Sequence, residues 1–100
     1  MHATDKLYYV YIMTNRERGV FYVGVTSDLI GRVWLHREQA QDGFVKQYKL
    51  RRLVWFEAYE DVHAAIAQEK KLKRWRRQWK IDLIEKMNPD WRNLWYDLEP

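Results

Sequence analysis

The sequence contains no cysteine and little glycine or proline, with four glycines and two prolines among its 100 residues. Without cysteine the chain can form no disulfide and no thiolate zinc site, and a reducing compartment, the cytoplasm, is the expected location. No segment approaches the roughly 18 consecutive apolar residues of a membrane-spanning helix. The start of the chain is short and polar, which is not typical of a secretory signal. With no repeat or linker, residues 1–100 predict a single domain with its core over about residues 7–98.

Positive charge is concentrated in one segment of the chain. The composition, 47% hydrophobic and 32% charged, is that of an ordinary globular protein. Residues 70–80 (KKLKRWRRQWK) hold seven basic side chains and no acidic one, whereas the whole chain has a formal net charge of only +4. Such a patch attracts polyanions through counterion release, and the alternative is the solvated face of a helix. The basic residues are Lys70, Lys71, Lys73, Arg74, Arg76, Arg77 and Lys80.

Three segments are rich in the β-branched and aromatic residues that favour strands. Residues 7–14 (LYYVYIMT) and 20–26 (VFYVGVT) are joined by a short polar stretch that ends at Gly19, which predicts a β-hairpin. Residues 50–59 (LRRLVWFEAY) have an apolar centre and predict a third strand.

The register of the hairpin decides which side chains share a face of the sheet. With a loop of residues 15–18, Thr14 faces Gly19. Tyr11 then lies directly opposite Tyr22, on the same face of the sheet.

Helical periodicity follows the hairpin and the third strand. Ser27 or Asp28 is a suitable N-cap for a helix that runs to about Ala40. Asp61 can cap a longer helical pattern, which the spacing allows to divide into two helices, the later one over residues 78–87. The inward positions of the first helix are Leu29, Val33, His36 and Ala40.

The predicted fold class is therefore α+β, a three-stranded antiparallel sheet flanked by helices in the order ββαβαα. The tail that follows Pro89 carries enough apolar area to fold back onto the core. Its apolar residues are Trp91, Leu94, Trp95 and Leu98.

Glu69 is an unexpected residue on the apolar side of the long helical pattern, three residues after Ile66 and three before Leu72. A carboxylate at such a position is costly to bury unless it is paired, hydrogen-bonded or bound to a metal. Glu69 is therefore a candidate metal ligand. The alternatives are a salt bridge to an inward-reaching arginine or a position at the edge of the buried face.

Arg32 and His36 lie one helical turn apart on the same face of the first helix. Arginine offers a planar fork of donors to phosphate oxygens, and histidine can move a proton near neutral pH, so the pair suits a phosphate. Both residues are equally compatible with an ordinary helix surface. Tyr11 and Tyr22 join this candidate site if their hydroxyls lie on its side of the sheet, and otherwise they are core aromatics.

Trp75 and Trp79 interrupt the basic segment at helical spacing. Tryptophans between basic residues can stack on unpaired bases. Helical spacing favours the other interpretation, in which both side chains belong to the core.

Five positions in order resemble one family. Tyr9-Val10-Tyr11 stands where GIY-YIG nucleases carry Gly-Ile-Tyr, and Tyr22-Val23-Gly24 stands where they carry Tyr-Ile-Gly. Arg32 and His36 follow on a helix after the hairpin, as in that family, and Glu69 matches the position of its metal-binding glutamate. The resemblance is closest to the short, stand-alone bacterial members, and related domains occur in excision-repair and homing endonucleases.

The resemblance extends over nearly the whole chain, with one departure and one open position. Tyr9 replaces the first glycine of the motif, which is its least chemical part. The family also carries an asparagine late in the domain, and Asn88 is the better match, with Asn93 as the alternative.

The resemblance implies a GIY-YIG fold and a metal-dependent endonuclease that hydrolyses phosphodiester bonds. Glu69 would hold a single divalent ion, Mg²⁺ or Mn²⁺. Arg32 would bind the non-bridging phosphate oxygens, and Tyr11 would act as general base, helped or replaced by His36. Tyr22 would orient the attacking water or the phosphate.

The remaining implied roles concern support and binding. Asn88 would steady the site by hydrogen bonds, and the basic residues of segment 70–80 would bind phosphates that flank the cut. The expected substrate is DNA rather than RNA, selected by structure, in DNA repair or recombination. No membrane partner and no small-molecule cofactor are expected, and the oligomeric state stays open. The alternatives are a non-catalytic nucleic-acid-binding module that keeps the fold, and a regulatory domain whose basic helix meets an acidic protein.

Overall fold

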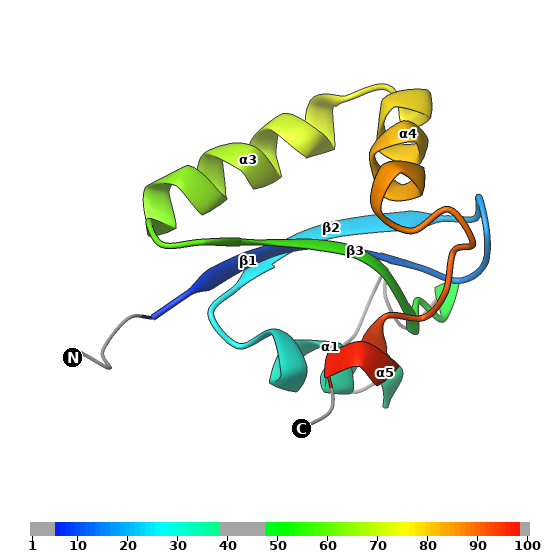
Figure 1. Ribbon diagram of the computed structural model, residues 1–100, viewed down its shortest axis with the longest axis horizontal. Coiled ribbons are helices and arrows are strands. Elements are labelled where there is room, and N and C mark those ends of the chain that lie inside the picture. Colours follow the sequence, from blue (N-terminus) through cyan, green and yellow to red (C-terminus); the bar gives the residue numbers. More distant parts are fainter. Residues whose placement is uncertain (1–5, 39–47, 99–100) are drawn as a thin grey trace.

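The computed structural model describes residues 6–38 and 48–98, which form an antiparallel sheet between two layers of helices (Figure 1). Within these residues the sheet has three strands in the order β2-β1-β3, and both pairings are antiparallel, as predicted. No helix in this part of the chain is long and apolar enough to cross a membrane. The strands are β1 (Tyr8–Thr14), β2 (Phe21–Thr26) and β3 (Arg52–Tyr59).

The helices cover both faces of the sheet. Figure 1 shows α3 and α4 on one face and α1 and α5 on the other. The predicted order ββαβαα is confirmed, and the short helix α5 is added at the end. The helices are α1 (Leu29–Arg37), α3 (Val62–Arg74), α4 (Arg77–Met87) and α5 (Trp95–Leu98).

The central strand β1 is buried on both faces, so the protein has one core on each side of it. Val10 and Ile12 belong to the core beneath α3 and α4, and Tyr11 and Met13 to the core beneath α1 and α5. All four side chains have no exposed surface. Strand geometry requires this division, because successive side chains point to opposite faces. Tyr11 is therefore a buried residue of the α1 side.

The predicted register of the hairpin is wrong by two residues. Thr14 pairs with Phe21, not with Gly19. The loop is longer than the four residues expected because the Asn15 side chain accepts a hydrogen bond from the Val20 backbone N–H at 2.8 Å. This side-chain bond takes the place of a bond between the strands, so the ladder begins only at Phe21.

Tyr11 accordingly lies opposite Gly24, and Tyr22 lies opposite Met13. Side chains alternate with a period of two, so a shift of two residues leaves each on the same face. Tyr11 and Tyr22 still share the α1 side of the sheet, with ring centroids 6.2 Å apart.

Of the two candidates for the first N-cap, Ser27 and Asp28, the cap is Asp28; the predicted N-cap Asp61 is confirmed, and the helix boundaries differ in detail. The Asp28 carboxylate accepts a hydrogen bond from the Gly31 N–H at 3.0 Å, and the Asp61 carboxylate accepts one from the His63 N–H at 3.1 Å. Helix α1 ends at Arg37, and Ala40 lies outside the described residues.

The long helical pattern divides into α3 and α4, the second of the two alternatives that the spacing allowed. Trp75 and Arg76 separate the helices and have extended backbone angles. The third strand begins at Arg52 rather than at Leu50, although Leu50 is still buried.

The tail folds back onto the domain, as predicted, and it contributes residues to both cores. Trp91 is buried under α4, where its ring stacks on Phe21 with centroids 5.9 Å apart and its Nε1–H donates to Glu85 at 2.8 Å. Leu94, Trp95 and Leu98 pack on the α1 side.

Asn88 holds this tail in place from the end of α4. Its side-chain amide donates to the Val54 carbonyl at 3.2 Å and to the Arg92 carbonyl at 2.9 Å. Its Oδ1 accepts a hydrogen bond from the Arg92 N–H at 3.0 Å. Asn88 thus joins α4, β3 and the tail through backbone groups.

Replacing this side chain tests its structural role. Asn88→Ala is expected to lower the free energy of unfolding by about 1–3 kcal/mol, because buried backbone groups lose their partners. Urea unfolding followed by tryptophan fluorescence measures the change. An unchanged midpoint would contradict the proposed support.

Candidate active site

The hydroxyl of Tyr11 is the point at which the predicted site residues meet. It shares a hydrogen bond of 3.0 Å with Nε2 of His36, from α1. The positive charge of Arg32, from the same helix, and the negative charge of Glu69, from α3, act on the same hydroxyl. Residues that are far apart in sequence and belong to helices on both sides of the sheet therefore act on one hydroxyl, His36 through a hydrogen bond and Arg32 and Glu69 through their charges.

Helix α1 positions Arg32 and His36. Leu29 and Val33 are buried against the sheet and fix the rotation of the helix about its axis. His36, one turn after Arg32, is then fully buried, while Arg32 is half-buried. A buried histidine on the inner stripe agrees with the periodicity of the sequence.

Tyr22 completes the aromatic part of the site. Its ring centroid lies 5.2 Å from that of His36, in an edge-to-face arrangement. The rings of Tyr11 and His36 also meet edge to face, with centroids 5.6 Å apart. Tyr22 is half-buried, whereas Tyr11 is not exposed, so Tyr22 lies nearer to solvent.

Gly24 provides the space that Tyr11 occupies. A Cβ atom at Gly24 would lie 2.5 Å from the Tyr11 hydroxyl oxygen and 2.6 Å from Cζ of the same ring. The tyrosine therefore lies across the backbone of β2 at the one position of that strand without a side chain. Sequence reasoning treated this glycine only as a letter of the motif, and the correct register would have identified its role.

The ionisation of Tyr11 and His36 is set mainly by burial. Burial raises the pKa of Tyr11, and the charge of Tyr22 raises it further, while Arg32 opposes the rise. Burial, with the nearby charge of Arg32, lowers the pKa of His36 from 6.5 to about 4. At neutral pH the pair is thus a phenol and a neutral imidazole. Nδ1 of His36 is buried and has no hydrogen-bond partner in the described part of the chain.

Glu69 has an ion pair rather than an apolar environment alone. Its side chain is 13% exposed, and its carboxylate lies 2.6 Å from the ammonium of Lys73, one turn further along α3. The predicted alternative is a salt bridge to an inward-reaching arginine. The salt bridge exists, but its partner is Lys73 of the same helix. Lys73 is 53% exposed and can turn away into solvent.

The surroundings of Glu69 limit how a metal could be held. Within residues 6–38 and 48–98, no group of three or more histidine, aspartate or glutamate side chains lies together. A single carboxylate fits Mg²⁺ or Mn²⁺, because such ions retain several waters and bind through one or two carboxylates. It does not fit zinc, which takes three or four protein ligands.

The two candidate asparagines hold backbone rather than the reacting groups. The side chain of Asn88 bonds main-chain atoms of β3 and the tail. That of Asn93 accepts hydrogen bonds from the N–H groups of Leu53 and Trp95, each at 3.1 Å. A role of Asn88 at the site is thus indirect, through the packing of the tail.

The basic segment surrounds the junction of α3 and α4. Lys80 is half-buried, and burial together with the charge of Arg77 lowers its pKa. Trp75 packs against the core, whereas Trp79 is 48% exposed, so the expectation that both are core residues is wrong for Trp79. Trp75 and Arg76 have extended backbone angles, so the buried face of α4 does not continue that of α3. The first buried residue of α4 is Ile81. The exposed basic residues are Lys70, Lys71, Lys73, Arg74, Arg76 and Arg77.

Comparison with known proteins identifies the class of this domain. A family model described as the GIY-YIG catalytic domain matches residues 7–82. A UPF0213 protein of Lacticaseibacillus paracasei is 31% identical over 87 residues, which cover 87% of this chain and 97% of the relative. No solved structure matches.

The chain belongs to the GIY-YIG family. This is a family of nucleases, so nucleic acid is the class of substrate that the domain implies, and its nucleases generally use divalent metal ions. The three-stranded sheet with flanking helices agrees with the fold of the family.

A methyl group at position 24 tests the contact between the two strands. Gly24→Ala should displace the Tyr11 ring and lower the free energy of unfolding by about 1–3 kcal/mol, because the buried ring has little room to move. Chemical unfolding measures the stability, and the ¹⁵N shifts of the His36 imidazole report its bond to Tyr11. Unchanged stability with unchanged shifts would refute the contact.

The lowered pKa of His36 predicts a dependence of stability on pH. Because the folded state disfavours the imidazolium, the contribution of His36 is complete above pH 6.5 and is lost as the pH falls toward 4. The advantage of wild type over His36→Gln in the free energy of unfolding should shrink by up to about 3 kcal/mol over that range. His63→Gln, which changes an exposed histidine, is the control. Parallel curves for wild type and His36→Gln would contradict the assignment.

Proposed function

We propose that this protein is a metal-dependent endonuclease that hydrolyses phosphodiester bonds in DNA. The observation that carries the proposal is the hydrogen bond between the buried hydroxyl of Tyr11 and His36, a hydroxyl on which the charges of Arg32 and Glu69 also act. Such a set combines a proton acceptor, a phosphate-binding cation and a carboxylate. These are the groups that hydrolysis of a phosphodiester requires.

Tyr11 and His36 act together on the attacking water, which must reach them past the half-buried Tyr22, because neither Tyr11 nor His36 has exposed surface. The oxygen of Tyr11 accepts a proton from the water while its own proton passes to Nε2 of His36, 3.0 Å away. The neutral imidazole can accept it, since the lowered pKa keeps His36 uncharged at neutral pH. This relay avoids a free phenolate and forms an imidazolium instead. Burial disfavours both charged forms, so the imidazolium depends on the negative charge of the bound phosphate for stabilisation. It combines the two candidate bases rather than choosing one.

Arg32 and Tyr22 bind and orient the phosphate. The guanidinium of Arg32 is half-buried beside Tyr11, where it can donate to the non-bridging oxygens as negative charge grows in the transition state. Tyr22 lies nearer to solvent, against the ring of His36, and its hydroxyl orients the water or the phosphate. Both residues are on the α1 side of the sheet, so they approach the phosphate from one direction.

Glu69 is the residue that would hold the divalent ion. A Mg²⁺ or Mn²⁺ ion bound there would polarise the scissile phosphate and stabilise the leaving oxygen. Lys73 then exchanges its ion pair with Glu69 for a phosphate of the substrate. Glu69 also contributes to the raised pKa of Tyr11, and this contribution disappears when its charge is neutralised.

The substrate is proposed to be DNA selected by its structure, in repair or recombination. The basic segment supplies phosphate contacts, which carry no sequence information. One domain of this size has little surface for reading bases, which favours recognition of branches, flaps or single strands. A cytoplasmic location is consistent with the absence of cysteine.

The test is cleavage of labelled single-stranded, duplex and branched DNA with Mg²⁺ or Mn²⁺. Glu69→Gln keeps the shape of the side chain and removes its charge, so the rate should fall about a thousandfold or more. Glu60→Gln, which changes an exposed carboxylate after β3, should cleave like wild type. Binding measured in EDTA should be equal for all three proteins.

Two outcomes would count against this function. Full cleavage by Glu69→Gln would refute the role of Glu69. Binding without cleavage on every substrate would favour the non-catalytic nucleic-acid-binding module.

A further inference from the structure

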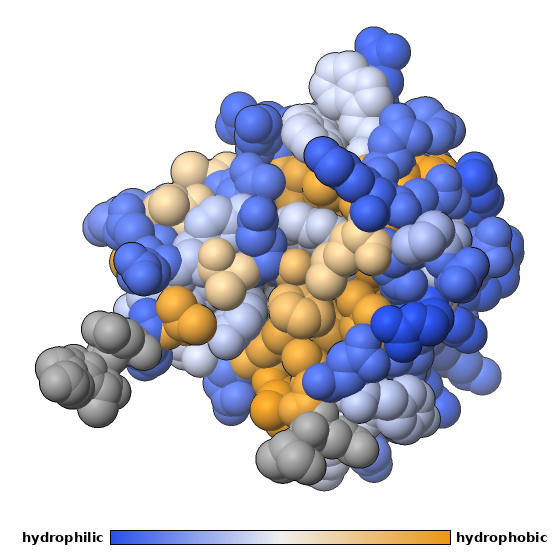
Figure 2. Space-filling model, in the orientation of Figure 1, coloured by the Kyte–Doolittle hydropathy of each residue, from blue (hydrophilic) through white to orange (hydrophobic). Residues whose placement is uncertain are grey.

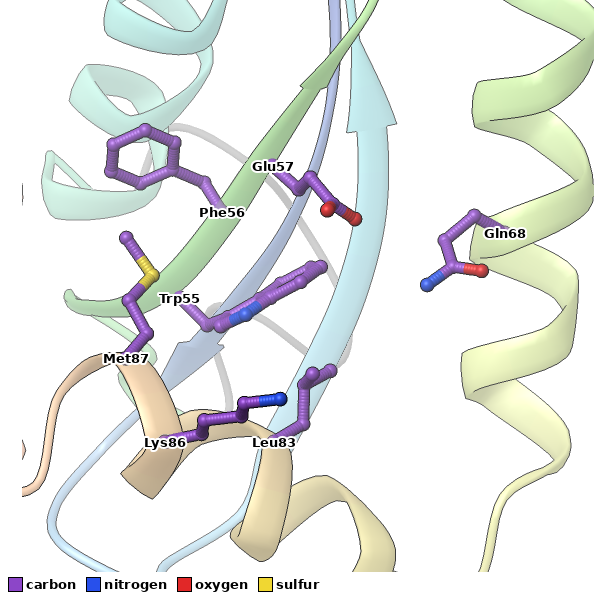
Figure 3. A pocket seen from close by; sticks show the side chains of 7 residues that line it. All are labelled: Trp55, Phe56, Glu57, Gln68, Leu83, Lys86 and Met87. Atoms are coloured by element: carbon purple, nitrogen blue, oxygen red, sulfur yellow. The ribbon is translucent and has the colours of Figure 1, made fainter.

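A groove at the junction of α3 and α4 is not used by the proposed nuclease site. It has a volume of about 250 Å³. It shares Leu83 and Lys86 with a neighbouring cavity, in which both side chains lie beside the indole of Trp55 and Gln68 of α3 lies on the opposite side (Figure 3). The residues that line the groove itself are Trp75, Trp79, Asp82, Leu83 and Lys86.

Two indoles form one wall of this groove. The rings of Trp75 and Trp79 meet edge to face with centroids 5.9 Å apart and an angle of 89° between their planes. Trp75 is held by the core, whereas 48% of Trp79 is exposed. A large aromatic side chain that lines a groove and is about half exposed is typical of a binding surface. On the side shown in Figure 2, apolar residues gather in a band down the middle of the molecule, between hydrophilic surfaces.

Cations lie against both indoles. The guanidinium carbon of Arg76 is 5.0 Å from the ring centroid of Trp79, and the ammonium of Lys71 is 5.8 Å from that of Trp75. Asp82, the acidic residue of the groove, accepts a hydrogen bond from the side chain of Gln78 at 2.9 Å. Lys86, which also lines the groove, offsets the charge of Asp82, so Arg76 and Lys71 leave the wall positive and a polyanion is the complementary partner.

Further cations extend from the groove toward Glu69. Lys70 and Arg74 are exposed and each lies two residues from the buried Leu72, so both point away from the sheet. Six residues correspond to about 600° around a helix axis, so Glu69 and Trp75 are about 120° apart, on either side of the buried Leu72. The short path between them is therefore covered by the sheet. A strand that reaches both must cross the outer face of α3, and this face carries the two cations.

We propose that the groove binds an unpaired base of a single-stranded segment of nucleic acid, stacked on Trp79. The basic segment holds the adjoining phosphates. A paired base cannot enter, because its faces are covered in the duplex, whereas every unpaired base presents a face to an aromatic ring. The inference rests on the proposed nuclease function and adds that the preferred substrate has an unpaired strand next to the cut, as in a flap.

The experiment measures equilibrium binding of labelled single-stranded and duplex oligonucleotides of equal length, in EDTA so that no cleavage occurs. Trp79→Ala should weaken single-stranded binding about 5- to 150-fold and leave duplex binding unchanged. Trp79→Phe should retain most of the single-stranded affinity, because the aromatic face remains. Trp34→Ala removes a tryptophan of α1 that is 51% exposed, and it should bind like wild type.

The salt dependence separates stacking from charge. The slope of log K against log salt concentration should be unchanged in Trp79→Ala, whereas Arg74→Gln should reduce it by about 0.7 for a single strand. Equal losses on single strands and duplexes, or no loss on single strands, would overturn the base-stacking site. So would a change of oligomeric state in Trp79→Ala, since the groove would then be a contact between copies of the chain.

Failure of this inference and failure of the nuclease function are distinguishable. The binding measurement contains no metal and needs no turnover, so loss of the Trp79 effect leaves the cleavage result unaffected. Single-stranded affinity that depends on Trp79 in a protein that cuts nothing would support the groove and refute the nuclease.

Discussion

The hydrogen bond between Tyr11 and His36 is the constraint on which the rest of the site depends. Tyr11 lies on the central strand, in a fully buried position that an apolar residue would ordinarily occupy. Its hydroxyl needs a partner there, because an unpaired buried polar group is costly. The partner is His36, which lies on the buried face of α1. The bond is possible because Gly24 leaves room for the Tyr11 ring. The same burial keeps the phenol of Tyr11 protonated and the imidazole of His36 neutral. Burial thus determines both the packing of the pair and its protonation state.

The two faces of the sheet divide the remaining work. The α1 side carries Tyr22, Arg32 and His36, which act on a proton and a phosphate. The α3 and α4 side carries Glu69 and the basic segment, which act through charge and bind the polyanion. The charge of Glu69 acts on Tyr11 although α3 covers the other face, so the proposed chemistry draws on residues of both layers. The groove beside Trp79 lies on another flank of α3, and this separation allows one strand of the substrate to be held at one place and cut at another.

Much of this arrangement could be predicted from the sequence, and the errors have identifiable physical causes. The periodicity of α1 placed His36 inward, and the apolar stripe of α3 singled out Glu69, because helical spacing and burial are local properties. The register of the hairpin could not be predicted from strand propensity, because Asn15 closes the loop through its side chain. The role of Gly24 was missed for that reason. The exposure of Trp79 depends on two extended residues that break the helix, and hydrophobic spacing alone does not locate that break.

The most direct test of the central claim is the single-turnover cleavage rate of Tyr11→Phe on a branched DNA substrate with Mg²⁺ or Mn²⁺. Tyr9→Phe, a half-buried tyrosine of the same strand, is the matched control, and circular dichroism verifies that both variants are folded. If the Tyr11 hydroxyl relays the proton to His36, its removal should slow cleavage about 10²- to 10⁴-fold and leave binding in EDTA unchanged, with the control at the wild-type rate. Cleavage by Tyr11→Phe at the wild-type rate would contradict the account, because the atom on which the site converges would then have no part in the reaction.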